Sequence, residues 1–138
     1  MNKIIVIDTN VLISSFLFSG IPNKVLQLVI NEDCDLYLSH DILNEFLHVL
    51  SRTKFELAPL QIKQFYEELI HITNIVYPKS EYRVVKEDPD DDILFYCAVE
   101  ANADFLVTGN KHVLKVKSFM NVQVITPRDF LDKYYGNL

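Results

Sequence analysis

The sequence has few of the residues that interrupt or cross-link a chain. Its 138 residues include three glycines, five prolines and two cysteines, and 49% of them are hydrophobic. This composition predicts a single domain over residues 1–138 that buries a sizeable core and contains no disordered tract. Cys34 and Cys97 form no CxxC pair and have no histidine spaced for zinc, and one disulfide would not make a framework. We therefore expect two free thiols, with Cys97 as a small core residue.

Long hydrophobic runs are also missing. No apolar stretch reaches the roughly 18 to 20 residues that a membrane span requires. The N-terminus lacks the charged, apolar and small-residue order of a signal peptide. These absences predict a soluble, cytoplasmic protein with no membrane association.

Positive charge is in short supply, because the formal net charge is −6 at pH 7. Static nucleic-acid binders normally present a basic face to the phosphates, so this balance argues against that class. However, residues 87–92 alone contribute −5, which leaves the rest of the chain near −1. An enzyme that meets phosphates through bound metal ions needs less basic surface, since the ions are the largest positive charges present.

Short apolar runs alternate with helical patterns along the chain. Strands are expected at residues 3–8, 36–38, 75–77, 105–108 and 122–126. Helices are expected at residues 10–18, 22–31, 40–52, 59–72, 90–102 and 127–134. Short apolar strands separated by helices predict an α/β fold with a mostly parallel sheet that is covered on both faces.

Acidic side chains are expected at the carboxyl ends of the strands, where open α/β sheets bind their ligands. Asp8 follows the buried run at residues 4–7, and five acids in six positions open the expected helix at 90–102. Right-handed crossovers leave the carboxyl ends of parallel strands on one side, so these two places can meet. One or two acids at a helix start need only a capping role, but five repel one another strongly unless a cation neutralises them.

Glu45 supplies a third acidic point. The core stripe of its helix contains Ile42, Phe46, Val49 and Leu50, and Glu45 lies about 40° beyond Val49. A position at the margin of the stripe is compatible with an ordinary solvated glutamate. It can equally aim a carboxylate into a crevice.

The acidic residues indicate which ion would bind. Asp88, Asp90 and Asp92 fit the first three ligand positions of an EF-hand loop, but Ile93 and Val99 replace its glycine and its final glutamate. The calcium-loop reading therefore fails. Oxygen ligands without a His or Cys cluster favour Mg²⁺ or Mn²⁺ over zinc. Such ions activate water and stabilise the oxygens of a phosphate displacement, so phosphodiester cleavage is the favoured reaction.

Five motifs follow one another along the chain, at Ile7–Leu12, Ser39–Phe46, Asp88–Asp92, Leu106–Asn110 and Ile125–Leu131. The weakest of them is D-T-N after a strand, and the most specific is the acidic run followed by L-V-T-G. In this order the motifs resemble the PIN domain family, and within it the VapC-like toxins of toxin–antitoxin systems.

This resemblance implies a three-layer α/β/α sandwich and a metal-dependent endoribonuclease. Asp8, Glu45 and Asp91 would be the catalytic acids. Asp8, Asp91 and Asp88 would hold Mg²⁺ or Mn²⁺, with Asp88 a close second to Asp91. The implied partners are an RNA substrate, a cognate antitoxin protein that silences the pocket, and a second copy of the chain in a homodimer.

The sequence departs from the family at Asn110, where many members have an aspartate. An amide offers a neutral oxygen but no charge, so the fourth acid is either absent or replaced by Asp88 or Asp92. His112 is a candidate for proton transfer or phosphate contact. Asn10 would orient the first loop, and Thr9 is a candidate to hydrogen-bond metal-bound water or phosphate.

Three lysines after the L-V-T-G motif have two readings. They are candidates to position an RNA backbone, or they belong to a solvated surface. They are Lys111, Lys115 and Lys117.

Two other functions remain open. A phosphoacceptor receiver domain needs an acidic pair after its first strand and a lysine after its last. Here residue 7 is isoleucine and no lysine follows Ile125 within the turn. A catalytically silent RNA- or protein-binding module on the same fold is favoured by Asn110. Metal-dependent turnover of RNA separates that module from a nuclease.

Overall fold

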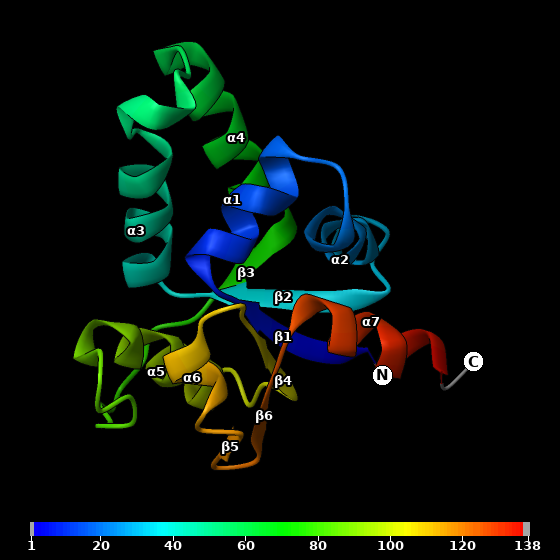
Figure 1. Ribbon diagram of the computed structural model, residues 1–138, viewed down its shortest axis with the longest axis vertical. Coiled ribbons are helices and arrows are strands. Elements are labelled where there is room, and N and C mark those ends of the chain that lie inside the picture. Colours follow the sequence, from blue (N-terminus) through cyan, green and yellow to red (C-terminus); the bar gives the residue numbers. More distant parts are fainter. Residues whose placement is uncertain (1, 137–138) are drawn as a thin grey trace.

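The computed structural model describes residues 2–136, apart from the side chains of Thr53 and Tyr135. Within this range the strands form one six-stranded sheet in the order β3-β2-β1-β4-β6-β5 (Figure 1). Neighbouring strands are parallel except for β5 and β6. The strands are β1 (Lys3–Ile7), β2 (Cys34–Leu38), β3 (Thr73–Ile75), β4 (Phe105–Val107), β5 (Ser118–Phe119) and β6 (Val122–Ile125).

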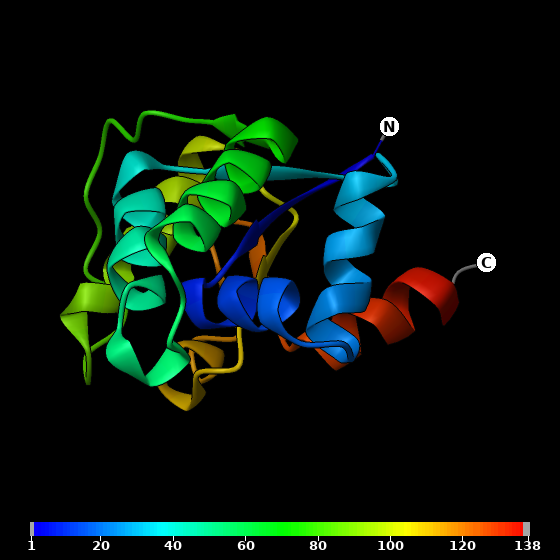
Figure 2. The same ribbon diagram turned by 90° about the horizontal axis from the view of Figure 1, so that it is seen from above.

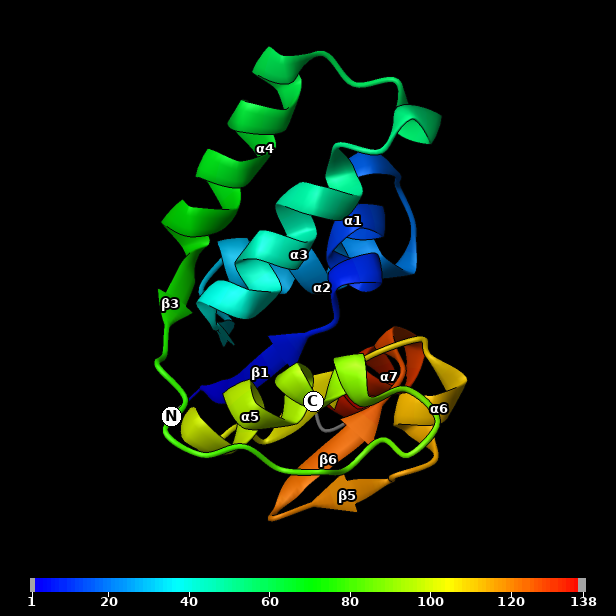
Figure 3. The same cartoon turned by 90° about the vertical axis from the view of Figure 1, so that its left-hand side faces the viewer.

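Helices cover both faces of this sheet. They are α1 (Thr9–Leu17), α2 (Ile21–Ile30), α3 (His40–Leu50), α4 (Pro59–Ile72), α5 (Asp92–Glu100), α6 (Lys111–Leu114) and α7 (Pro127–Gly136). Helix α5 packs on β1, β2 and β4, whereas α2 contacts α1, α7 and β2. Figure 3 shows α5 in front of the sheet and α7 behind it. The expected three-layer α/β/α sandwich with a mostly parallel sheet is confirmed.

The buried residues explain why these elements form. Ile5, Val6 and Ile7 in β1 are each at most 1% exposed, as expected for a central parallel strand with helices on both faces. In α3 the predicted apolar stripe is buried, and Ser39 caps the helix by accepting a hydrogen bond from the Ile42 N–H at 3.4 Å. Glu45 is half-buried at the margin of this stripe.

The structure differs from the predicted elements at the edges of the sheet. Strand β3 begins directly after α4, two residues before the predicted start, because Thr73 pairs with Leu36 of β2. Strand β5 and helix α6 were not predicted. Strand β5 turns into β6 through Met120 and Asn121, which both have positive φ as a two-residue hairpin turn requires.

Residues 76–88 connect β3 to the acidic run. They follow the outside of the molecule past α5 (Figures 2 and 3). Two short 3₁₀ helices, Thr53–Phe55 and Pro89–Asp91, precede α4 and α5 respectively. No single helix within residues 2–136 is long and apolar enough to cross a membrane. Helices α1 and α2 together have the length and the apolar composition of a membrane span, but the two helices are bent by 90° relative to each other.

Both cysteines are free and buried, and the burial of Cys97 was predicted. Burial raises the pKa of the Cys34 thiol and that of the Cys97 thiol to about 12. Neutral, enclosed thiols are poor nucleophiles and poor metal ligands. The two cysteines therefore serve as core residues.

Candidate active site

The first acidic residue is fixed by its neighbours at the carboxyl edge of the sheet. Asp8 follows β1 directly and is 5% exposed. Its Oδ2 accepts a hydrogen bond of 2.6 Å from the Thr108 hydroxyl, at the end of the adjacent strand β4. Burial raises the pKa of Asp8, and hydrogen bonds from Thr108 and from the backbone N–H groups of Asn10 and Thr9 oppose that rise.

Thr108 is a site residue that sequence reasoning missed. It is fully buried, and its Oγ1 also accepts a 3.0 Å hydrogen bond from the Asn110 N–H. One hydroxyl therefore links Asp8 to the loop that follows β4. The L-V-T-G motif contained this signal, since a threonine at a buried strand end is placed to donate to a neighbouring carboxylate.

Helix α3 brings Glu45 to the same edge. Burial raises the pKa of Glu45, and repulsion from Asp8, Asp88 and Asp90 adds to the rise. Thr9 Oγ1 is buried beside Glu45 and opposes this rise, although it makes no hydrogen bond of standard geometry among the described residues. Glu45 therefore lies near other carboxyl groups.

The acidic run contributes Asp91 and Asp88. The pKa of Asp91 is raised to about 7, first by burial and then by repulsion from Asp88, Asp8 and Glu45. A hydrogen bond between the carboxyl groups of Asp88 and Asp91 acts in the same direction. The structure thus brings together four carboxyl groups, which we call the acidic cluster: Asp8, Glu45, Asp88 and Asp91.

Asn110 closes this cluster with an amide. Its Nδ2 donates to Asp91 Oδ2 at 3.3 Å, and its Oδ1 accepts from the His112 N–H at 2.8 Å. The second contact caps α6. An aspartate would cap the helix equally well but could not donate to an ionised Asp91. Asn110 therefore gives Asp91 a partner without adding a fifth charge.

Asp92 makes its hydrogen bonds with a neighbouring segment of backbone. It is 3% exposed, and its Oδ1 accepts hydrogen bonds from the backbone N–H groups of Val85 at 2.7 Å and Val84 at 3.0 Å. This carboxylate ties the 76–88 segment to the start of α5. Of the two replacements considered for the fourth acid, Asp88 is the one in the cluster.

The remaining candidates lie around the cluster. Asn10 is exposed and, with Asp8, Ser14, Gly109 and Asn110, lines a cleft of about 370 Å³. This cleft gives access to the buried Asp8. The His112 side chain is exposed and lines a separate pocket beside Glu87.

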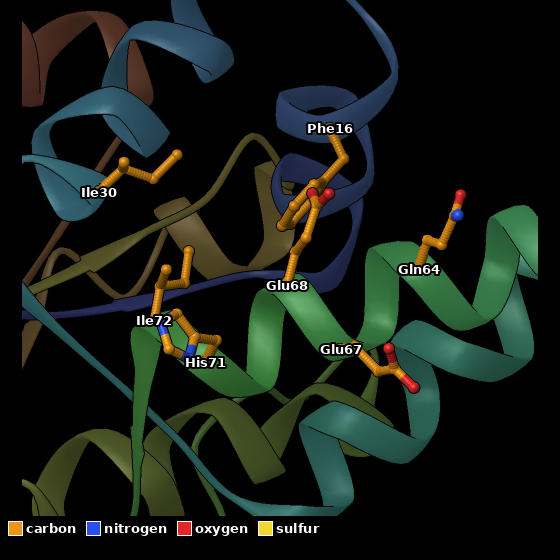
Figure 4. A pocket seen from close by; sticks show the side chains of 7 residues that line it. All are labelled: Phe16, Ile30, Gln64, Glu67, Glu68, His71 and Ile72. Atoms are coloured by element: carbon orange, nitrogen blue, oxygen red, sulfur yellow. The ribbon is translucent and has the colours of Figure 1, made fainter.

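A second cavity of about 680 Å³ lies between α1, α2 and α4 (Figure 4). Phe16, Ile30 and Ile72 come from these three helices, and Glu68 and His71 of α4 also line the cavity. No member of the acidic cluster reaches it. The cavity with the greater volume is therefore not the candidate active site, which we place at the carboxyl groups.

The donor chemistry of the cluster fits a hard divalent cation. Carboxylate oxygens suit Mg²⁺ and Mn²⁺, and a cation would relieve the repulsion that raises the pKa of Asp91. Among the residues that the structure describes, no three acidic, His or Cys side chains are arranged to ligate one ion directly. Mg²⁺ typically takes one or two protein carboxylates and keeps several waters, so such an open arrangement is compatible with it.

Comparison with known proteins places this chain in a family. The family model described as "PIN domain" matches residues 4–112, which include the whole acidic cluster. The chain is 28% identical to the uncharacterized protein MJ1680 of Methanocaldococcus jannaschii, over 94% of this chain and 90% of that protein.

Two solved structures share the fold. One is VapBC2 from Rickettsia felis, bound to a DNA fragment from their promoter. Its matching chain has a TM-score of 0.64 and 18% identity, over 88% of this chain and 97% of that chain. The other is the T. brucei RRP44 PIN domain, with a TM-score of 0.56 and 11% identity, over 99% of this chain and 84% of that chain. PIN domains are generally nucleases, and PIN nucleases generally use divalent metal ions. The protein described here belongs to the PIN domain family.

Proposed function

We propose that this protein is a metal-dependent endoribonuclease that hydrolyses RNA phosphodiester bonds. Asp8, Glu45 and Asp91 are its proposed catalytic acids, and Asp8, Asp91 and Asp88 are the proposed ligands of Mg²⁺ or Mn²⁺, directly or through water bound to the ion. The observation that carries the proposal is the convergence of carboxyl groups whose pKa values are raised by burial and mutual repulsion. Such groups are typical of sites that act on protons and cations.

A bound divalent ion would supply positive charge to the phosphate and a water of lowered pKa. The chain's own residues do the positioning. Thr108 holds the Asp8 carboxylate in one orientation, and Asn110 holds that of Asp91. Glu45 is half-buried with a raised pKa, which makes its carboxylate a stronger base and suits it to accept a proton from the attacking water.

We also propose that the protein is the toxin of a type II toxin–antitoxin pair, silenced by a cognate antitoxin. The support is the likeness of fold to VapBC2 from Rickettsia felis, together with the sequence motifs. A neighbouring gene for a small partner that copurifies with this chain would support the assignment. The homodimer expected from the family resemblance stays a prediction.

The second candidate function is a catalytically silent PIN-fold module that binds RNA or protein. Asn110 favours it, because a neutral amide stands at the position where many family members have an aspartate. The two functions differ in one observable, which is metal-dependent turnover.

The test is an RNA cleavage assay with purified protein. A mixed RNA substrate is incubated with Mn²⁺, with Mg²⁺ and with a chelator, using the wild type, Asp8→Asn and the matched control Asp132→Asn, which alters an exposed residue of α7. We expect cleavage in both metals, no cleavage in chelator, loss of at least about a hundredfold in Asp8→Asn, and wild-type activity in Asp132→Asn. Circular dichroism would verify that Asp8→Asn is folded. A fully active Asp8→Asn protein would sink the assignment, and a folded but inactive wild type would favour the silent module.

A further inference from the structure

A pocket of about 330 Å³ with cationic walls lies next to the acidic cluster. Val84, Val116 and Phe119 give it an apolar floor. Glu87 also lines it. We call it the basic pocket, after the four exposed side chains that surround it: Arg83, Lys86, His112 and Lys115.

The basic pocket and the acidic cluster share two stretches of chain. Glu87, which lines the pocket, is followed directly by Asp88 of the cluster. On the other side, the His112 N–H donates to Asn110, whose amide donates to Asp91. A strand of nucleic acid with one phosphate at the cluster would therefore bring neighbouring phosphates to the basic pocket.

The walls of the basic pocket are held in place by buried contacts. The segment that contains Arg83 and Lys86 is anchored through the Val84 and Val85 N–H groups, which both donate to Asp92. Phe119 packs edge-on against the rings of Tyr82 and Phe95, at centroid distances of 5.5 and 5.8 Å. The backbone that carries the basic side chains is therefore fixed by these contacts.

The distribution of charge indicates that the basic pocket could attract an anion that the acidic cluster repels. Residues 87–92 carry five of the six net negative charges, so the cluster alone repels a polyanion. Within the described residues Arg83 and Lys86 form no ion pair, and Lys115 pairs with Glu87 at 3.4 Å. That pair is exposed and contributes little, so a phosphate can replace Glu87 at small cost.

We propose that the basic pocket binds backbone phosphates of the RNA substrate beside the bond to be cleaved. The inference rests on the proposed ribonuclease function and adds the residues that hold the substrate. Arg83, Lys86 and Lys115 contact phosphate, and the acidic cluster acts on the adjacent phosphodiester. Because the contacts are to the backbone, the pocket contributes affinity without sequence preference.

The test measures RNA binding in the absence of cleavage. Asp8→Asn protein is titrated into a fluorescein-labelled single-stranded RNA in chelator, and anisotropy is followed between low and moderate salt. The variant is Arg83→Ala/Lys86→Ala/Lys115→Ala on the same background. A control with the same charge change is Arg52→Ala/Lys24→Ala/Lys63→Ala, whose residues line neither the basic pocket nor the cleft at Asp8.

We expect the basic-pocket variant to bind about tenfold more weakly and to lose about 2 from the slope of log affinity against log salt, since each single-strand phosphate contact contributes about 0.7. The control should retain the slope. Equal slopes for the two triple variants, or no RNA binding by the parent at low salt, would overturn the inference. Absence of metal-dependent cleavage by the wild type would instead overturn the proposed ribonuclease function. The RNA-binding titration would still show whether the basic pocket binds RNA.

Discussion

At the scale of single residues, the least expected part of the site is a hydroxyl. Thr108 donates to Asp8 at 2.6 Å and accepts from the Asn110 N–H at 3.0 Å, and it does both without access to solvent. It touches neither substrate nor ion in the proposed reaction. Its role would be to keep Asp8 ionised and to hold the carboxylate in one orientation.

Thr108→Val tests that role with a side chain of similar shape that cannot donate. Loss of a buried hydrogen bond to a charged group should lower the free energy of unfolding by about 1.5–3 kcal/mol. Because the hydrogen bond lowers the pKa of Asp8, the acidic limb of the pH–rate profile should move to higher pH. Thr108→Ser should restore both properties. An unchanged profile in a destabilised Thr108→Val protein would reduce Thr108 to a packing residue.

At the scale of elements, the sequence predicted the long elements well and the short ones poorly. The strand that precedes Asp8 and the helix that carries Glu45 were placed within about two residues, because their apolar patterns are regular. Strand β5 has two residues and turns through Met120 and Asn121, so no alternation and no glycine marked it. Tertiary pairing, which a single sequence does not display, decides such short elements.

The acidic run shows the same limit within one motif. All five acids look alike in the sequence, yet the structure gives them different surroundings. Asp88 and Asp91 join the cluster, Asp92 binds the backbone of Val84 and Val85, and Glu87 lies beside Lys115. Which acid faces which partner depends on the 3₁₀ turn at Pro89–Asp91, and a spacing rule cannot specify that turn.

The attachment of the 76–88 segment to α5 leads to a prediction. Asp92→Ala leaves the Val84 and Val85 N–H groups without their acceptor, which should cost about 2–3 kcal/mol in the free energy of unfolding. Asp92→Asn keeps one side-chain oxygen and should cost less. Urea unfolding gives the energies, and amide hydrogen exchange at Val84 and Val85 should accelerate in Asp92→Ala. Equal losses in the two variants would show that the charge of Asp92, and not its acceptor oxygen, is the stabilising feature.

At the scale of the whole molecule, the concentration of negative charge in one place couples stability to pH and to cations. The pKa of Asp91 is about 7 in the folded protein, whereas an unfolded chain gives an aspartate its ordinary value near 3.9. Between about pH 4 and pH 7 the folded state therefore holds a proton that the unfolded state has lost. In chelator the free energy of unfolding should fall as the pH rises through this window, because stability falls with pH wherever the folded state binds more protons.

Asp91→Asn should weaken this dependence, since an amide does not titrate. In chelator we expect wild-type protein to lose about 1–2 kcal/mol between pH 5 and pH 8, a figure reduced for solvent screening of the half-buried group. The variant should lose less over the same range, while the exposed control Asp132→Asn should follow the wild type. Mn²⁺ at about one hundred times its dissociation constant should return about 2.7 kcal/mol to the wild type at pH 8. Urea unfolding at the two pH values measures all of these quantities. If wild-type and Asp91→Asn proteins had the same pH dependence in chelator, the repulsion at Asp91 would not be coupled to folding, and the acidic cluster would need no cation for its stability.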